Sequence, residues 1–437
     1  MDIQPCCLRY LSTIANRKAR PSLGRRKTDV CFEIDFNLEK IALTFRSHHH
    51  NTETQDNMTT RRTMLQALAG AALLPAGFPA LAAAPAGEAL KDIAKRKGMR
   101  FGTAVGAGAN QFGNAAYRAL VERECNIIVA ENEMKWQALE PTRDAYRFGP
   151  ADAMLAWAEK SGMAMRGHNL FWQPEKWLPA WVAKENFGKD RARVERLMRK
   201  HAQTVCAHYG TRIQSWDVMN EAVDPADGKM RQNALTRPFS GPAGAIEQVD
   251  LAFRLAKEYA PHAQLVYNDY MREDSGSAKH RAGVLTMLAE LKKRGTPVHA
   301  LGLQAHIGSW DESKKRGRED MLEWRKFLDE ATAMGYDLLI TEFDVNDRAL
   351  PADIAKRDAG VAAAAREFLD VTLSYPRLKD FLLWGMADHI SWLQTWDEAP
   401  RKDKLPQRPL PYDAQLRAKP LREAIADAMR AMPDRQA

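Results

Sequence analysis

The sequence predicts a closed barrel of eight parallel strands surrounded by helices, the (β/α)8 or TIM barrel, built as one domain over residues 88–437. Short apolar runs with strand character alternate with longer amphipathic stretches, and the alternation repeats eight times. A strand followed by a helix, repeated in this way, implies parallel strands, and eight such units are enough to close a barrel. No linker or change of composition marks a second domain in this range.

A doubly wound open sheet is the alternative arrangement of such units. A nucleotide-binding sheet of that kind carries G-x-G-x-x-G after its first strand and an acidic residue further along the chain. The segment GAGAN at 106–110 has neither the spacing nor the acidic partner. The closed barrel is therefore the favoured architecture.

The predicted strands are short runs rich in apolar, β-branched and aromatic residues. They cover 99–105 (MRFGTAV), 126–134 (NIIVAENEM), 164–172 (AMRGHNLFW), 215–223 (SWDVMNEAV), 264–270 (QLVYNDY), 300–307 (ALGLQAHI), 337–345 (DLLITEFDV) and 381–390 (FLLWGMADHI). Stretches with apolar residues three and four positions apart predict the helices. They cover 115–125, 150–162, 191–210, 249–260, 279–295, 321–335, 359–374 and, closing the chain, 417–432.

Polar and aromatic residues gather where the predicted strands end. From the second run to the eighth they are Glu131, Asn132 and Lys135; His168 and Trp172; Asn220 and Glu221; Asn268 and Asp269; Gln304 and His306; Glu342 and Asp344; and Trp384, Asp388 and Trp392. The carboxyl ends of barrel strands meet at one face, where the active sites of this fold lie. If these residues did not share one functional site, each of the seven strand ends would need its own polar residues as a separate cap.

Glu221, in WDVMNEAV, has two interpretations. It is a capping or ion-pairing group at a strand end, or it is a carboxyl that keeps its proton near neutral pH among Trp216, Met219 and Val223. Glu342 supplies a second carboxyl on the seventh strand. A pair of carboxyls flanking a cleft lined with tryptophan is the arrangement of glycosidases, in which one carboxyl donates a proton and the other attacks or activates water.

The surroundings of the two glutamates suggest their roles. His306 and Asp344 would hold Glu342 oriented and ionised, which suits a nucleophile, whereas the apolar neighbours of Glu221 suit a proton donor. Asn220 would offer its amide to the substrate 2-hydroxyl, a contact that strengthens in the transition state.

Seven motifs in order, AENEMKW, GHNLFW, WDVMNEA, NDY, QAH, ITEFDV and WGMADHISW, closely resemble glycoside hydrolase family 10, the endo-β-1,4-xylanases. The resemblance runs from about residue 90 to 432, and it implies xylan and xylo-oligosaccharides as binding partners. It implies a retaining mechanism in xylan degradation, with Glu221 as acid/base, Glu342 as nucleophile and the two carboxyls about 5–5.5 Å apart. His306 would bond to the nucleophile and Asn268 would lie by the acid/base on the leaving-group side. The sugar contacts that the resemblance implies are Glu131, Asn132, Lys135, His168, Trp172, Asn220, Asn268, Gln304, Trp384 and Trp392.

The chain departs from the family pattern after the third strand. Gln173 stands where the family usually has histidine, and the loop that follows is two residues longer, which adds Trp177. The sugar contact that a glutamine usually makes in the family is lost here or replaced, and Glu175 is the candidate replacement. We therefore expect the glycone pocket to differ in detail from that of the family.

Bulk composition excludes some other functions. The chain of 437 residues is 45% hydrophobic and 27% charged, and its net charge of +8 is not gathered in one patch, so we expect no nucleic-acid partner. The five cysteines form no C-x-x-C pair and have no zinc spacing with histidine, so we expect no metal and no cofactor. We expect a monomer. Two rival functions are a barrel glycosidase acting on β-1,4-glucan and a binding-only barrel, whose mark would be the loss of one carboxyl.

Residues 58–87 resemble a bacterial twin-arginine export signal. Arg61 and Arg62 precede an alanine-rich apolar stretch that ends in A-x-A cleavage sites, and Pro75 and Pro79 break it too often for a membrane span. We expect export to the periplasm or the medium, with no membrane attachment after cleavage. Met58 would then be the initiator, and residues 1–57 a non-native upstream extension, expected to be disordered.

Overall fold

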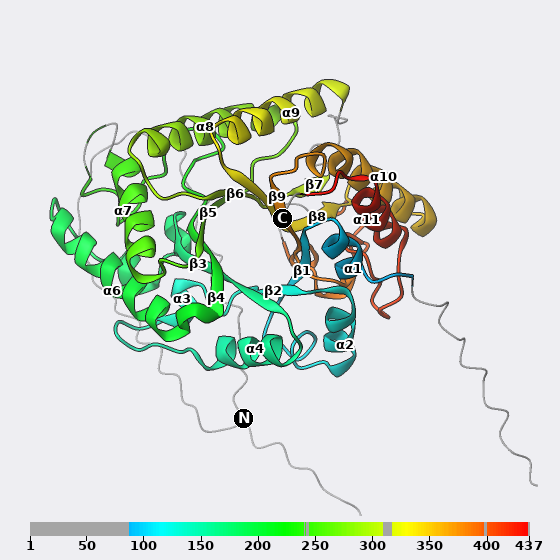
Figure 1. Cartoon of the computed structure of the whole chain (residues 1–437), viewed down its shortest axis with the longest axis horizontal. Coiled ribbons are helices and arrows are strands. Elements are labelled where there is room, and N and C mark those ends of the chain that lie inside the picture. The colour runs from blue at the N-terminus through cyan, green and yellow to red at the C-terminus, as the bar shows by residue number, and fades with distance from the viewer. Residues whose placement is uncertain (1–86, 240, 242–243, 309–316, 397–399, 436–437) are drawn as a thin grey trace, which may run out of the picture. The chain divides into compact units, whose positions relative to one another are not determined.

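Parallel strands form the centre of the computed structural model (Figure 1). They are β1 (Arg100–Val105), β2 (Ile127–Ala130), β3 (Ala164–Trp172), β4 (Ile213–Asn220), β5 (Gln264–Asp269), β6 (Ala300–Leu303), β7 (His306–Gly308), β8 (Asp337–Asn346) and β9 (Leu378–Leu383). Each strand from β1 to β5 pairs with the next, β6 pairs with β8, β8 with β9, and β9 with β1. All strands except the short β7, which pairs only with β8, therefore form a closed ring. The predicted (β/α)8 barrel is confirmed.

The structure describes residues 87–437 except 240, 242–243, 309–316, 397–399 and 436–437. All of them belong to one compact unit, Pro79–Ala437. The predicted upstream extension and all but the last residue of the predicted export signal lie outside the described residues. Within the described part of the chain, no helix combines the length and the apolar character that crossing a bilayer requires.

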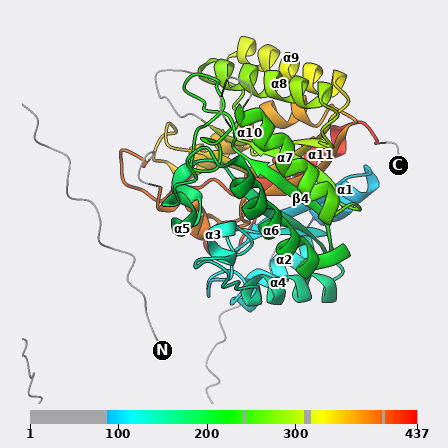
Figure 2. The ribbon, with the colours of Figure 1, turned by 90° about the vertical axis from the view of Figure 1, so that its left-hand side faces the viewer.

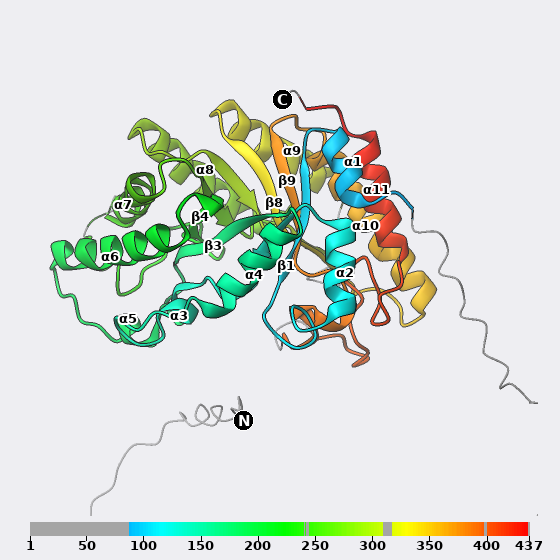
Figure 3. The same cartoon turned by 60° about the horizontal axis from the view of Figure 1, so that its bottom comes forward.

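Helices surround the ring (Figures 1 and 2). They are α1 (Leu90–Arg96), α2 (Ala115–Glu124), α3 (Trp136–Leu139), α4 (Gly149–Lys160), α5 (Ala180–Ala183), α6 (Arg191–Tyr209), α7 (Gly244–Tyr259), α8 (Ala278–Lys293), α9 (Arg318–Ala333), α10 (Ile354–Thr372) and α11 (Pro420–Ala431). Asn114, Asp190 and Asp353 begin α2, α6 and α10 by accepting hydrogen bonds from free backbone N–H groups, which is why these helices start where they do. The closing helix α11 packs against α1 and α10 (Figure 3).

Buried apolar side chains join the ring to the helices. Phe101 of β1, Val121 of α2 and Ile425 of α11 belong to one large core cluster and are fully buried. Neighbouring strands also pack closely: a Cβ atom at Gly167 of β3 would lie 2.1 Å from the indole of Trp216 on β4. The tight ring leaves the strand ends, rather than a central pore, as the place for a site.

Several predicted strands have different limits in the structure, and the fourth ends at Asn220, before its predicted end at residue 223. The second ends at Ala130, so Glu131 and the polar residues after it lie in a loop. The sixth is divided because Ala305, with φ at 60°, interrupts the extended backbone between β6 and β7. The eighth begins earlier than predicted and ends at Leu383, before Gly385 with φ at 108°, which a residue with a side chain rarely adopts. Hydrophobicity did not reveal the breaks at Ala305 and Gly385, since apolar residues continue past both of them.

Candidate active site

The carboxyl ends of β3, β4 and β5 bring three predicted site residues into line. Trp172 is in register with Asn220, and Asn220 with Asn268. Glu221 follows immediately with φ at 57°, and its backbone N–H donates to the Asn268 carbonyl at 2.9 Å. A left-handed conformation is uncommon for a residue with a side chain and is often found at functional sites. It turns the chain at the rim of the barrel, where Glu221 is partly exposed.

Glu342 lies within β8 and is held at both carboxylate oxygens. Its Oε1 accepts a hydrogen bond from Asn268 Nδ2 at 2.8 Å, and its Oε2 lies 3.3 Å from His306 Nε2. On the other side of the imidazole, His306 Nδ1 lies 3.0 Å from Asp344 Oδ2, which also accepts from Trp392 Nε1 at 2.7 Å. The predicted support of Glu342 by His306 and Asp344 is therefore present in the geometry.

This arrangement keeps Glu342 ionised. Burial acts to raise its pKa, but the hydrogen bond from His306 and the electrostatic interactions with His168, His306 and Lys135 outweigh burial, so the pKa of Glu342 falls below its ordinary value. His306 is affected in the opposite sense. Burial lowers its pKa, but Asp344 and Glu342 raise it to about 10, so the imidazole is a cation at neutral pH and can donate to both carboxylates.

Glu221 has the opposite electrostatic environment. Burial raises its pKa, and the negative charge of Asp269 on β5 raises it further. Hydrogen bonds with Gln304 and Trp172 oppose this shift without cancelling it, the first being a 3.0 Å bond from Gln304 Nε2 to Glu221 Oε1. The pKa of Glu221 therefore lies above the ordinary value for glutamate, which is the property expected of a resting proton donor.

Side-chain amides lie between the two carboxyls. The amide of Asn220 is 2.9 Å from Asn268 Nδ2 and 3.2 Å from Gln304 Nε2, and in its other orientation it accepts from Trp172 Nε1 at 3.0 Å. The side chain of Asn268 turns toward β8 and donates to the predicted nucleophile Glu342, while the Asn268 carbonyl lies by the backbone of the predicted acid/base Glu221. The reason is the Thr341 hydroxyl, which donates to Asn268 Oδ1 at 2.7 Å and fixes the amide toward β8.

The loop after β2 brings a buried cation to the same place. Lys135 Nζ donates to Asn132 Oδ1 at 2.9 Å and lies 4.6 Å from the Trp172 ring centroid and 5.7 Å from that of Trp384. Burial lowers the pKa of Lys135 below its ordinary value, and the negative charges of Glu342, Glu131 and Glu221 offset this shift only in part. Glu131 itself accepts from Gln111 Nε2 at 2.8 Å.

Aromatic rings and imidazoles complete the wall of the site. The ring of His168 lies 5.3 Å from that of Trp384, and the ring of His306 lies 5.0 Å from that of Trp392. The structure thus brings all the predicted site residues to one end of the barrel. Their contacts with sugar remain a prediction.

Sequence reasoning missed some members of the site and gave others no role. Gln111, which holds Glu131, follows the first strand, where no polar residue was singled out. Asp269 was noted at its strand end, but its effect on the pKa of Glu221 depends on the two strands being neighbours. The NDY motif, which contains Asp269, was the sequence signal that could have drawn attention to this residue.

Gln173, the first residue of the departure after the third strand, has a structural role. Gln173 is buried, donates to Gln248 Oε1 at 2.6 Å and accepts from Asn233 Nδ2 at 2.7 Å, so its side chain is committed to the protein interior. Glu175 accepts from Arg237 Nη2 at 2.6 and 2.7 Å. The Glu175 carboxylate is partly exposed in this ion pair, and its contact with sugar stays a prediction.

Asp217 was expected to be structural, and it lies in a buried polar group beside the site. It accepts from Arg166 Nη2 at 2.5 Å and lies 2.8 Å from His168 Nδ1, and all three side chains are at most 2% exposed. The ion pair of Asp217 with Arg166 thereby fixes the imidazole of His168 at the barrel mouth.

Removing one partner of this pair should be costly. We expect Asp217→Ala to lower the free energy of unfolding by about 3–5 kcal/mol, because it leaves the Arg166 guanidinium buried without a counter-charge. Urea unfolding followed by circular dichroism measures the change. Asp380→Ala is the matched control, since its partner Arg100 is 35% exposed and returns to water. An equal or larger loss in the control would contradict this explanation.

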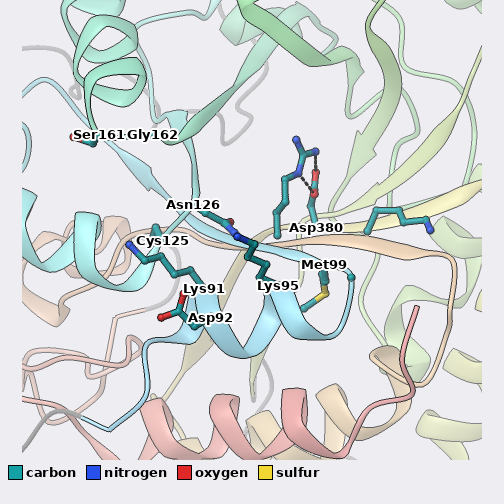
Figure 4. Close-up of a pocket in the computed structure, with 12 residues that line it drawn as sticks. Lys91, Asp92, Lys95, Met99, Cys125, Asn126, Ser161, Gly162 and Asp380 are labelled. Carbon is teal, nitrogen blue, oxygen red and sulfur yellow. Dashed lines mark hydrogen bonds and ion pairs between the residues drawn. The ribbon is translucent and has the colours of Figure 1, made fainter. Parts of the chain in front are cut away.

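A second hollow, of about 700 Å³, lies at the opposite ends of the strands (Figure 4). Its lining includes Arg100 and Asp380, which stand at the beginnings of β1 and β9 and form a double ion pair at 2.6 and 2.7 Å. Residues at this end of a barrel mainly serve stability, and an acid paired in this way is not available for chemistry. The carboxyl end of the ring is the candidate active site.

Metal ligands and thiols are the remaining reactive groups of the described residues. Within them, no group of three histidine, cysteine or acidic side chains is placed to hold a metal ion. Cys125 and Cys206 are buried free thiols, and burial raises the pKa of both.

A family model, related sequences and solved structures all match this chain to the same group of enzymes. The model of the family described as "Glycosyl hydrolase family 10" matches residues 89–428. Endo-1,4-beta-xylanase A of Cellvibrio japonicus is 31% identical over 354 residues, which cover 75% of this chain and 54% of that protein. Endo-1,4-beta-xylanase B of Thermotoga neapolitana is 30% identical over 310 residues, which cover 70% of this chain and 82% of that protein. The crystal structure of xylanase 10B from Thermotoga petrophila in complex with xylobiose superposes with a TM-score of 0.68 at 29% identity, covering 78% of this chain and 97% of that one.

Proposed function

The chain belongs to glycosyl hydrolase family 10 and is a glycoside hydrolase, and from this premise we propose that it is a retaining endo-1,4-β-xylanase. It hydrolyses internal β-1,4-xylosidic bonds of xylan in two steps. The observation that carries the proposal is the pair of glutamates with opposite pKa shifts, Glu342 lowered and Glu221 raised.

In the first step Glu342 Oε attacks the anomeric carbon while Glu221 gives its proton to the glycosidic oxygen. The bond from that carbon to the leaving oxygen breaks, and an ester between the sugar and Glu342 forms. In the second step the ionised Glu221 takes a proton from water, whose oxygen attacks the anomeric carbon and releases Glu342. Two inversions at the same carbon give net retention.

Support for the substrate comes from the relatives and from the walls of the site. Xylobiose is bound in the relative from Thermotoga petrophila, and xylotriose in a mutant of the xylanase TsXylA, whose structure has a TM-score of 0.64 with this chain at 25% identity. Xylose lacks the hydroxymethyl group that glucose carries on C5. The bulky Trp384 and Trp392 at the end of the last strand would crowd that group and favour xylan over β-1,4-glucan.

Product analysis tests this proposal. The purified protein is incubated with xylan and with β-1,4-glucan, the products are separated by chromatography, and proton NMR follows the anomer formed first. Xylo-oligosaccharides that appear first as the β-anomer support a retaining xylanase. Products mainly from glucan would overturn the substrate, α-anomers would overturn retention, and binding of xylan without products would leave a binding-only barrel.

The pH dependence of kcat/KM should follow the two glutamates. Glu342 must be ionised, so activity falls on the acidic side at its lowered pKa, and Glu221 must be protonated, so activity falls on the basic side at its raised pKa. Asp269→Asn removes the charge that helps to raise the pKa of Glu221, so we expect the basic limb to move to lower pH while the acidic limb stays. Stopped assays across pH measure both limbs.

The control is Asp427→Asn, at an exposed position of α11. It should leave both limbs unchanged. If the basic limb of Asp269→Asn stayed at the wild-type pH, or moved upward, Asp269 would not be the group that tunes Glu221.

A further inference from the structure

Trp177 is an exposed indole directly beside the active site. It ends the short 3-10 helix Glu175–Trp177 and is 39% exposed, and it is the only aromatic residue among the most exposed large apolar side chains of the described part of the chain. An indole left in water is not explained by core packing. The position therefore calls for an explanation in terms of a ligand.

The ring of Trp177 continues the wall of the site. It stacks on the ring of Trp172, with centroids 4.7 Å apart and planes 8° from parallel. Trp172 in turn is in register with Asn220, next to the proton donor Glu221, and carries the ammonium of Lys135 4.6 Å from its centroid. Trp177 thus covers one face of Trp172 and turns its own opposite face away from that ring.

Hydrogen bonds fix the turn that carries Trp177. Its N–H donates to the Pro174 carbonyl at 2.9 Å, and the two hydrogen bonds between Glu175 and Arg237 tie the same turn to the loop after β4. Leu178, the next residue, is buried. A binding surface that is already rigid loses little conformational entropy when it takes up a ligand.

The surrounding elements place this turn at the mouth of the barrel. Lys135 precedes α3, and Trp177 lies just before α5. The two short helices are neighbours in Figures 2 and 3, with the rings of Trp136 and Trp181 6.3 Å apart. The segments that carry Lys135 and Trp177 therefore stand on the same side of the site.

We propose that Trp177 forms an outer subsite that stacks on a xylosyl residue of a long substrate, beyond the sugars held next to the two glutamates. The hydroxyls of β-1,4-linked xylose are equatorial, so both faces of the ring are made of C–H groups and pack on a flat indole. The exposed ammonium of Lys176, 5.1 Å from the Trp177 centroid, can move into water when a sugar arrives. This inference rests on the proposed xylanase function.

The test compares short and long substrates in Trp177→Ala. We expect kcat/KM to fall about tenfold on xylohexaose and soluble xylan, mainly through KM, and to stay within about twofold on a short aryl xylobioside. Trp177→Phe keeps a flat ring and should recover most of the loss. Leu322→Ala, at a 54% exposed position of α9, is the matched control and should change neither substrate.

Each other outcome has a distinct meaning. An equal loss on short and long substrates, or no loss on either, overturns the outer subsite. Full recovery by an aliphatic Trp177→Leu would also overturn it, since stacking needs a flat face. Failure of the wild-type protein to cleave xylan at all would instead be a failure of the proposed function, because that result does not involve the variants.

Discussion

Glu342→Gly is expected to lose xylan hydrolysis by on the order of 10⁴-fold or more, and azide is expected to restore cleavage of a dinitrophenyl xylobioside. The variant removes the attacking carboxylate and leaves a space between Asn268 and His306 that a small anion can enter. Azide then attacks the anomeric carbon once, on the face that Glu342 uses, so the product is the α-xylobiosyl azide. Rate measurements and proton NMR of the product check the two halves of this prediction.

The stereochemistry makes this result specific to the assigned roles. Azide added to Glu221→Ala should attack the glycosyl-enzyme from the opposite face and give the β-azide. A β-azide from Glu342→Gly would show that the two roles are exchanged. Glu319→Gln, in the first turn of α9, is the control and should retain wild-type activity without azide.

Much of this arrangement could be predicted from the sequence, because the hydrophobic period of a segment and the polar residues at its end are visible in a short stretch of chain. Alternating strand and helix patterns predict the ring, and polar residues at strand ends predict which side chains share a face. The prediction of Asp344 beside His306 holds because β7 and β8 are in register at these two residues. A one-residue slip in this pairing would have separated them.

The errors concern backbone turns and contacts between distant segments. Ala305 adopts a left-handed conformation that its side chain does not favour, and no composition signal marks it. Gln173 is buried because Asn233 and Gln248, far along the chain, supply its partners. The direction of the Asn268 amide depends on the hydroxyl of Thr341, 73 residues later. Such contacts exist only after the ring has closed.

The opposite pKa shifts of Glu221 and Glu342 also depend on the closing of the strand ring. Asp269 lies on the strand next to that of Glu221, whereas His306 lies on the short strand next to that of Glu342. A negative neighbour raises the pKa of one carboxyl, and a cation lowers the pKa of the other. The pKa values of two residues of the same type are thereby shifted in opposite directions, as a proton donor and a nucleophile require.

Glu221→Ala should separate the two steps according to the leaving group. Xylan has a poor leaving group that needs a proton, so we expect its hydrolysis to fall by about 10²–10⁴-fold. The dinitrophenolate group of a dinitrophenyl xylobioside leaves without a proton, so Glu342 still forms the ester. The water of the second step then lacks its general base, and the glycosyl-enzyme intermediate accumulates. Stopped-flow absorbance should show a burst of dinitrophenol, and intact mass should show the protein plus one xylobiosyl group.

The same variant should also lose the basic limb of the pH profile. On the dinitrophenyl substrate, kcat/KM reports only ester formation, which requires Glu342 ionised and no longer requires a proton on residue 221. The acidic limb should remain at the lowered pKa of Glu342 because its cause, the hydrogen bond from His306, is unchanged. Equal losses on both substrates with no burst would assign Glu221 a structural role. A basic limb that persisted in Glu221→Ala would mean that another group, with Lys135 the nearest candidate, titrates there.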